Sequence, residues 1–217
     1  MSPPSPINPI LLSAILLATL SPLRAAQPKI VCFGDSITAA KTGWVSILAA
    51  KDPAITFVNA GRGGRKTTDK AELLPVLAAN PDATTLLLFL GVNDLKDATE
   101  PQIAGCVTDM EWMVNQIRQT LPAAKIIILA PSDINLDTMS AVNIGKKYNT
   151  KTKSALADLE TRYKSLAQRL NVGFISLYKA VSPANYLDGL HPNPQGQQQI
   201  ADTVWAGLNA PSTPGNP

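Results

Sequence analysis

Two kinds of hydrophobic pattern alternate along this chain: short continuous apolar runs, and stretches with an apolar residue at every third or fourth position. The continuous runs are typical of strands that are buried on both faces of a sheet. They predict five strands, at residues 29–33, 55–58, 85–90, 125–130 and 172–175. Helical spacing predicts helices between them, at residues 43–50, 67–79 and 195–208 and in two longer segments.

Each longer segment carries one apolar stripe with steps of three and four residues. The first stripe consists of Ile103, Val107, Met110, Val114, Ile117 and Leu121, and the second of Leu156, Leu159, Tyr163, Leu166 and Leu170. Pro75 falls inside the helical pattern of residues 67–79 and should kink or split that helix. Residues 131–143 are not periodic and 176–193 are mostly irregular, so we expect loops there.

The alternation of strand and helix predicts an α/β protein with a parallel sheet covered on both faces. Right-handed crossovers leave few topologies. A flavodoxin-like strand order, 2-1-3-4-5, would place the first strand beside the third. No internal repeat is present, and we assign residues 27–210 to a single domain.

The N-terminus has a different character. Residues 9–20 are apolar and are followed by small residues at Ala25 and Ala26, which is typical of a signal peptide and too short to cross a bilayer. We therefore predict a signal peptide over residues 1–26, cleavage near Ala26, and a secreted or periplasmic protein with no stable membrane span. The alternative is an uncleaved N-terminal anchor. Residues 211–217 are expected to form a disordered tail.

The composition is that of a globular protein, with 45% hydrophobic and 16% charged residues and a formal net charge of +3. The lysines at 146–147 and 151–153 fit a solvated helix face, and sparse aromatic residues argue against nucleic-acid binding. Cys32 and Cys106 should be buried thiols, although export leaves a disulfide possible. One histidine and two scattered cysteines cannot supply a usual zinc site, so we expect no metal or cofactor.

Candidate chemistry begins where the first strand stops. The sequence Gly34-Asp35-Ser36 places a hydroxyl at the carboxyl end of that strand, where open α/β sheets bind ligands. The alternative is that Ser36 caps a helix. His191, the only histidine, follows Asp188 by three residues in a polar turn, so that one carboxylate can reach the near ring nitrogen. Together they could form a nucleophile, a base and an orienting acid, with a single histidine titration governing activity.

A serine esterase also needs hydrogen-bond donors for the oxyanion. The candidates are the backbone N–H groups of Ser36 and Gly64 and the side-chain amide of Asn93. Taken singly, the glycines could serve turns and Asn93-Asp94 could cap the next helix. Their joint placement at predicted strand ends favours an active site. Arg62 and Arg65 flank the glycine loop and are interpreted as solvated loop residues.

Four segments of the chain resemble the sequence blocks of the SGNH hydrolases, also called GDSL esterases and lipases. They are Gly34-Asp35-Ser36-Ile37, Asn59-Ala60-Gly61-Arg62-Gly63-Gly64, Gly91-Val92-Asn93-Asp94 and Asp188-Gly189-Leu190-His191-Pro192. The resemblance spans residues 29 to about 208, and departs at Gly63, where many relatives carry a small hydroxyl residue. It implies a three-layer α/β/α sandwich and cofactor-free ester hydrolysis. By position it makes Ser36 the nucleophile, His191 the base, Asp188 its partner, and Ser36, Gly64 and Asn93 the oxyanion donors.

The sequence therefore predicts an exported serine esterase for short-chain, especially acetyl, esters, with small acyl esters or acetylated carbohydrates as substrates. Residues 131–143 and 181–187 should form the walls of the site, and neither contains a long apolar run that would line a fatty-acyl groove. A lysophospholipase or thioesterase acting on longer acyl chains is the alternative enzyme. A non-catalytic sugar-binding module is the third hypothesis. No sequence feature indicates the oligomeric state.

Overall fold

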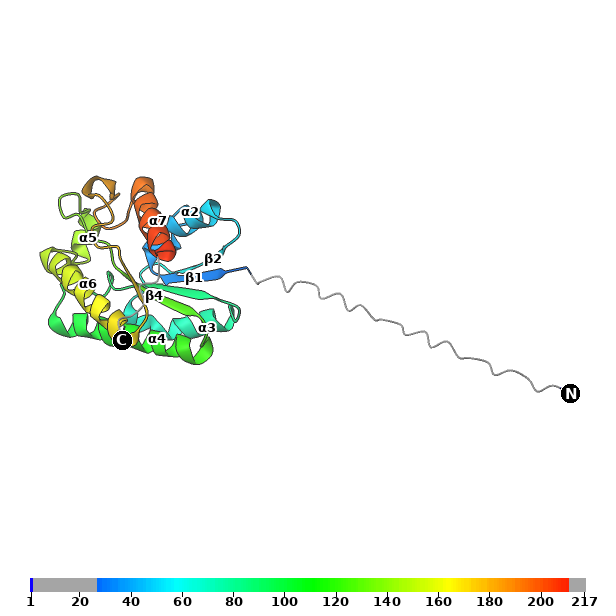
Figure 1. Ribbon diagram of the computed structural model, residues 1–217. Helices are drawn as coiled ribbons and strands as arrows, with labels where there is room; N and C mark the ends of the chain where they lie inside the picture. The colour runs from blue at the N-terminus through cyan, green and yellow to red at the C-terminus, as the bar shows by residue number, and fades with distance from the viewer. Residues whose placement is uncertain (2–26, 211–217) are drawn as a thin grey trace.

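The computed structural model describes Met1 and residues 27–210, so the predicted signal peptide and C-terminal tail lie outside the described residues. Five strands form one parallel sheet in the order β2-β1-β3-β4-β5, as predicted (Figure 1). The strands are β1 Lys29–Gly34, β2 Thr56–Gly61, β3 Thr85–Phe89, β4 Lys125–Ala130 and β5 Gly173–Ser176. Gly34 at the end of β1 pairs with Gly61 of β2 and Phe89 of β3, so three strands end at the same level.

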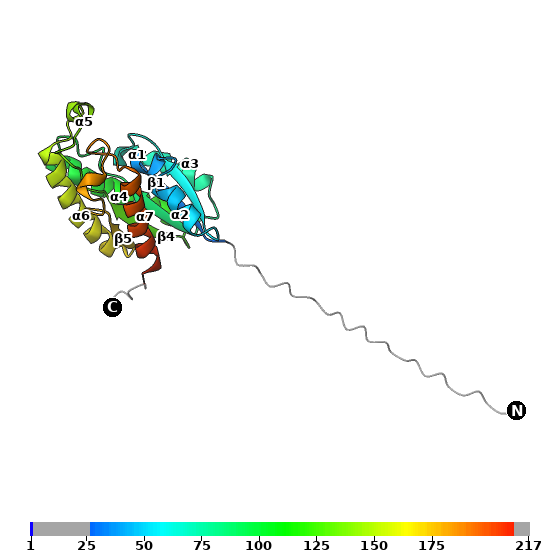
Figure 2. The same ribbon diagram turned by 90° about the horizontal axis from the view of Figure 1, so that it is seen from above.

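Helices cover both faces of the sheet (Figures 1 and 2), which confirms the three-layer α/β/α arrangement. One face carries α2 Trp44–Lys51 and α7 Pro194–Asn209; the other carries the short helices η1 Thr67–Glu72 and α3 Leu73–Ala78 and the long helices α4 Glu100–Thr120 and α6 Thr150–Leu170. Three further short helices, α1 Ser36–Ala39, α5 Ala141–Gly145 and η2 Pro183–Asn185, lie in the connections. Within residues 27–210, none of the helices has both the length and the hydrophobicity that crossing a membrane requires.

Alternation along β1 divides the core into two layers. Val31 and Phe33 pack with the apolar stripes of α4 and α6. Ile30 and Cys32 face the opposite side and pack with α2 and α7. Both layers are continuous, which explains why the central strands are apolar at consecutive positions after their first residues. Cys32 and Cys106 are buried free thiols, as predicted.

The predicted elements differ from the observed ones where short helices begin and end. The helix predicted over residues 67–79 is split, but the break comes between η1 and α3, ahead of Pro75. Pro75 lies in the first turn of α3, where a missing N–H costs nothing. Helix α1, which has four residues, and helix α5 are too short to produce a recognisable periodicity, and the sequence pattern missed both.

The close approach of β2 to α1 yields the first prediction. A Cβ on Gly61 would lie 2.3 Å from the backbone nitrogen of Ala39. Because the backbone cannot move aside cheaply, Gly61→Ala should lower the free energy of unfolding by about 1–3 kcal/mol, measured by urea denaturation.

Gly105→Ala is the matched control. Gly105 lies inside α4, where a new Cβ would meet no atom within 4 Å, so the free energy of unfolding of this variant should rise by about 0.5–1 kcal/mol. Equal stability of the two variants would show that β2 and α1 are not held at this separation.

Candidate active site

The polar residues predicted from the sequence meet at the carboxyl ends of β1 and β3. At the end of β1, the side chain of Asp35 accepts a hydrogen bond of 2.9 Å from the backbone N–H of Ile37. Asp35 is therefore the N-cap of α1, and Ser36 is its first residue. The alternative that Ser36 caps a helix is wrong by one position. This shift leaves the Ser36 hydroxyl free for other partners.

The Ser36 hydroxyl meets His191, which lies 155 residues further along the chain. Ser36 Oγ and His191 Nε2 are 3.0 Å apart, and His191 Nδ1 is 2.9 Å from Asp188 Oδ2. Both contacts are within hydrogen-bond distance. A neutral imidazole held by a carboxylate at Nδ1 presents its free Nε2 to the hydroxyl, which is the arrangement that can remove a serine proton. The structure thus brings Ser36, His191 and Asp188 into one chain of contacts.

Asp188 is itself held by the turn that follows it. Its Oδ1 accepts the backbone N–H groups of His191 at 2.8 Å and Leu190 at 3.1 Å. Burial alone would raise the pKa of Asp188, but the hydrogen bonds from the backbone and ring of His191 and from Leu190 outweigh it and lower the pKa to about 2. Gly189 closes the turn at a φ of 78°, a conformation that favours glycine. Asp188 is therefore ionised throughout the neutral range.

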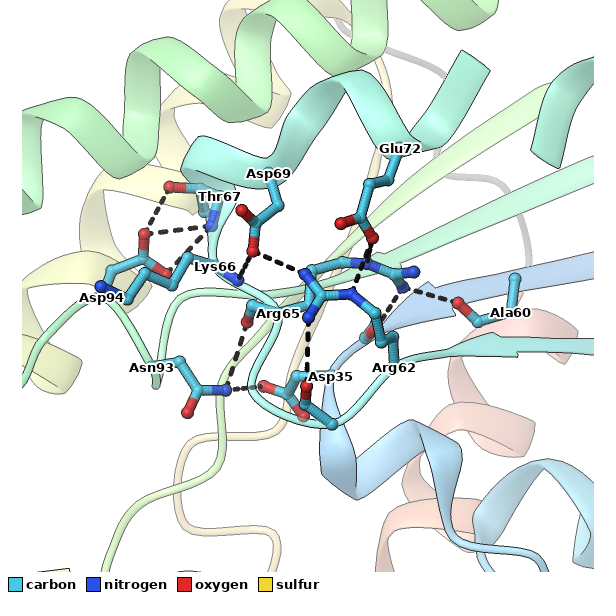
Figure 3. Close-up of polar contacts among 12 residues, drawn as sticks. Asp35, Ala60, Arg62, Arg65, Lys66, Thr67, Asp69, Glu72, Asn93 and Asp94 are labelled. Atoms are coloured by element: carbon cyan, nitrogen blue, oxygen red, sulfur yellow. Dashed lines mark hydrogen bonds and ion pairs between the residues drawn. The ribbon is translucent and has the colours of Figure 1, made fainter. Parts of the chain in front are cut away.

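Asn93 follows β3 and points toward the end of β1 (Figure 3). Its Nδ2 donates to the backbone oxygen of Arg65 at 3.2 Å and lies 3.4 Å from Asp35 Oδ2. Its Oδ1 accepts a hydrogen bond of 2.8 Å from the hydroxyl of Tyr148. Asn93 does not cap the next helix, because α4 begins after Thr99. The capping alternative for Asn93 is therefore wrong.

The glycine loop contributes an exposed backbone. Gly64 has a φ of 73°, and a Cβ at this position would meet no atom within 4 Å. Its conformation, and not crowding, is what requires glycine here. Within the described part of the chain, no hydrogen bond uses the backbone N–H of Gly64 or that of Ser36. Both are therefore free to donate to a ligand.

The interpretation of the loop arginines is only half right. Arg62 is exposed and pairs with Glu72 and Asp69 at 2.8 and 2.7 Å, as a solvated loop residue would. Arg65 is only 6% exposed. Its Nη1 donates to the backbone oxygens of Gly34 and Ala60, each at 2.6 Å. Figure 3 shows the contact with Ala60. Arg65 is thus buried and joins the carboxyl ends of β1 and β2 through hydrogen bonds. The expectation of a solvated side chain is wrong for this residue.

Asp35 adds a second titratable group beside the site. It is 1% exposed, and burial raises its pKa to about 7, against the opposing influence of the Ile37 N–H and the His191 and Arg65 side chains. The sequence analysis predicted a single titrating group, His191. Asp35, in contact with Asn93, adds an ionisation of its own near pH 7 to the site.

Two features of the site were missed by the sequence analysis. Tyr148 comes from the turn before α6, in a stretch of lysines that carries no catalytic pattern. The burial of Arg65 depends on the carbonyl groups it meets, and these cannot be read from its neighbours. No group of three or more His, Cys, Asp or Glu side chains that could hold a metal ion occurs within residues 27–210.

Comparisons with known proteins agree with this architecture. A sequence model of the GDSL-like Lipase/Acylhydrolase family matches residues 32–199. The chain is 28% identical over 204 residues to a GDSL esterase/lipase of Arabidopsis thaliana, covering 82% of this chain and 84% of the relative. It is 24% identical over 207 residues to an arylesterase of Vibrio mimicus, covering 89% and 94%. Among solved structures it resembles Est24, a carbohydrate acetylesterase from Sinorhizobium meliloti, with a TM-score of 0.69 and 20% identity, covering 82% of this chain and 99% of that one.

Asp35 gives a prediction about stability and pH. Because its pKa in the folded protein, about 7, lies above its ordinary 3.8, the folded state holds this proton more tightly than the unfolded chain. The resulting stabilisation is complete below pH 3.8 and is lost as the pH rises through 7. Asp35→Asn keeps a capping oxygen but has no such proton to lose. Its free energy of unfolding relative to wild type should therefore increase as the pH rises through this range, measured by urea denaturation.

Asp52→Asn is the control, because Asp52 also accepts the N–H two residues ahead, at 2.9 Å from Ala54, but is partly exposed. In Asp35→Asn, the new amide nitrogen faces Asn93 Nδ2, and this contact between two donors lowers the free energy of unfolding by the same amount at every pH. It therefore separates the stability curves of the variant and the wild type without changing how their difference varies with pH. A difference between Asp35→Asn and wild type that stays constant with pH would show that Asp35 is already ionised in mild acid.

Proposed function

The chain belongs to the GDSL-like lipase/acylhydrolase family and is a carboxylic ester hydrolase, and we propose that it cleaves short-chain acyl esters through a Ser36-His191-Asp188 triad. The observation that carries this proposal is the continuous line of contacts from Ser36 Oγ through the His191 ring to Asp188, at 3.0 and 2.9 Å. We also propose that it acts outside the cytoplasm, a proposal supported by the signal-peptide pattern of residues 1–26.

In the first half of the reaction, Ser36 Oγ attacks the carbonyl carbon of the ester while its proton passes to His191 Nε2. The electron pair of the carbonyl π bond moves to the oxygen, which becomes an oxyanion. When the tetrahedral intermediate collapses, the bond to the alcohol oxygen breaks, and this oxygen takes the proton from His191. Water then repeats the sequence on the acyl-enzyme, releasing the carboxylic acid and restoring Ser36. Asp188, ionised throughout, stabilises the imidazolium at Nδ1.

The oxyanion requires donors that are already in place when its charge develops. We assign this role to the backbone N–H groups of Ser36 and Gly64 and to the amide of Asn93. Support comes from the unused N–H groups at Ser36 and Gly64 and from the location of all three residues at neighbouring strand ends. Three donors of this kind could together stabilise the transition state by several kcal/mol.

The alcohol half of the substrate is proposed to be a carbohydrate, and the acyl half an acetyl group. A cavity of about 400 Å³ lies between the two segments expected to form the walls. Its lining is mixed: charged and polar residues such as Asp133, Asn135 and Lys179 stand beside the apolar residues Ile134, Val181 and Pro183. It adjoins the His191 loop, because Asn135 N–H donates to the oxygen of Gly189 at 2.8 Å. The charged and polar side chains of this lining can hydrogen-bond to sugar hydroxyls, and a structural neighbour is a carbohydrate acetylesterase.

A chain-length series tests the acyl preference. We expect chromogenic acyl esters to be hydrolysed fastest as the acetate, with kcat/KM falling as the acyl chain lengthens, because neither wall segment contains a long apolar run that would line a fatty-acyl groove. The same protein should release acetate from acetylated polysaccharides. A maximum at long chains would favour a lysophospholipase or thioesterase, and no hydrolysis of any ester would favour a sugar-binding module.

Covalent labelling tests the nucleophile. An organophosphonate should modify Ser36 alone, since its hydroxyl is the one held against His191. Mass spectrometry should locate the adduct, and Ser36→Ala should lose both adduct and turnover. Ser46→Ala serves as the control, because the Ser46 hydroxyl only donates to the Gly43 oxygen. An adduct on another residue, or a fully active Ser36→Ala, would overturn the assignment.

Asn93→Ala tests the oxyanion donor. Negative charge develops on the carbonyl oxygen only as the intermediate forms, so loss of the amide should lower kcat on the order of 10²–10³-fold. KM should change little, because the bound ester barely uses this contact. Steady-state kinetics on an acetyl ester would measure both.

Asn80→Ala is the matched control for Asn93→Ala. Asn80 is also buried, but its amide donates to the backbone oxygen of Val76, and it precedes β3, whereas Asn93 follows the carboxyl end of that strand. This variant should keep its kcat. If Asn93→Ala is destabilised yet turns over at the wild-type rate, Asn93 has no part in the mechanism.

A further inference from the structure

Tyr148 lies between α5 and α6 and reaches the site from outside all four sequence blocks. Its side chain is buried, with 2% exposure, and its hydroxyl is 2.8 Å from Asn93 Oδ1. Its backbone N–H donates to the oxygen of Asn143 at 3.2 Å. Asn143 in turn donates through its side-chain amide to the backbone oxygen of Asp188 at 3.1 Å. One short corner of the chain therefore contacts both Asn93 and the loop that carries Asp188.

The Asn93 amide has hydrogen-bond partners at both of its polar atoms, and together they determine which way it faces. In the observed orientation, Oδ1 meets the Tyr148 hydroxyl, and Nδ2 meets two acceptors, the backbone oxygen of Arg65 and Oδ2 of Asp35. A half-turn of the amide would bring its oxygen against those two acceptors and leave the acceptors without a donor. Buried polar atoms without partners are costly. The amide is thus restrained at both of its polar atoms.

Tyr148 can only serve as the donor in this pair if its hydroxyl keeps its proton. Burial raises the pKa of Tyr148, and the nearby carboxylates of Asp35, Asp94 and Asp188 raise it further. The phenol is consequently protonated at every pH at which an esterase works. Since Oδ1 of Asn93 can only accept, the hydrogen bond runs from Tyr148 to Asn93.

We propose that Tyr148 is a positioning residue for ester hydrolysis: its hydroxyl holds Asn93 Oδ1 so that the amide nitrogen faces the oxyanion. The inference rests on the proposed role of Asn93 as an oxyanion donor. Tyr148 touches no reacting atom and acts entirely through Asn93. Its contribution is to fix the amide before substrate arrives, which is what makes such a donor effective in the transition state.

Tyr148→Phe removes the hydroxyl and keeps the ring. We expect kcat for an acetyl ester to fall by about tenfold, the effect of one lost neutral hydrogen bond, with KM nearly unchanged. This loss is smaller than that of Asn93→Ala, because the amide remains and is only less well oriented. The rate is expressed per active site titrated with the organophosphonate, so that any unfolded fraction does not count as lost turnover.

Two further variants separate positioning from a general structural effect. Tyr163→Phe is the matched control. Tyr163 is fully buried, and its hydroxyl donates to the backbone oxygen of Leu90, in the segment between β3 and Asn93, without contacting the Asn93 amide. It should keep its kcat. In the Asn93→Ala background, Tyr148→Phe should cause no further loss of kcat, because there is no longer an amide to orient.

Each outcome of this double-mutant cycle is decisive. A tenfold loss that vanishes in the Asn93→Ala background supports the inference. The same loss in both backgrounds, or a wild-type kcat in Tyr148→Phe while Asn93→Ala is impaired, overturns the role of Tyr148 and leaves the proposed function standing. A wild-type kcat in Asn93→Ala removes the oxyanion role of Asn93 and this inference with it.

Discussion

One buried guanidinium holds together the strand ends on which the site is built. Arg65 donates to the last residue of β1 and to Ala60 of β2, while its own backbone oxygen accepts the amide of Asn93 beyond β3 (Figure 3). Its charge lies 4.1 Å from the centre of the Phe33 ring and 3.0 Å from Glu72, so burial does not leave it unpaired. Because these ends lead directly into Ser36, Gly64 and Asn93, their spacing depends on this side chain.

The burial of Asp35 is an energetic cost of placing Ser36 at the end of β1. To free the Ser36 hydroxyl, the cap of α1 must be the preceding residue, and that residue is buried against Asn93. Asp35 forms no salt bridge among the described residues, and the attraction of His191 and Arg65 does not offset its desolvation. Its pKa rises as a result. A carboxylate that is unfavourable for stability at neutral pH is thus retained directly before Ser36, the proposed nucleophile, as expected of a functional site.

How much of this could be predicted from the sequence depends on how local each constraint is. The strands and the strand-end positions of Ser36 and Asn93 follow from apolar runs and the residues that end them, and right-handed crossovers leave few possible strand orders. Asp188 and His191 are three residues apart, so their contact is a matter of one turn. The contact of Arg65 with Gly34 spans 31 residues and that of Tyr148 with Asn93 spans 55, and no periodicity indicates either. These two contacts exist only because the completed sheet brings their partners to one edge.

The contacts of Asn93 also differ in strength in a way that suits catalysis. The bond from Tyr148 is short, at 2.8 Å, whereas the contact with Asp35, at 3.4 Å, is at the limit of a hydrogen bond. In the proposed role of Asn93, an oxyanion that takes the amide proton facing Asp35 displaces the weaker partner and leaves the stronger one in place. The amide does not have to rotate, and little of its existing stabilisation is lost. A donor restrained tightly on its oxygen and loosely on one N–H is ready for a charge that exists only in the transition state.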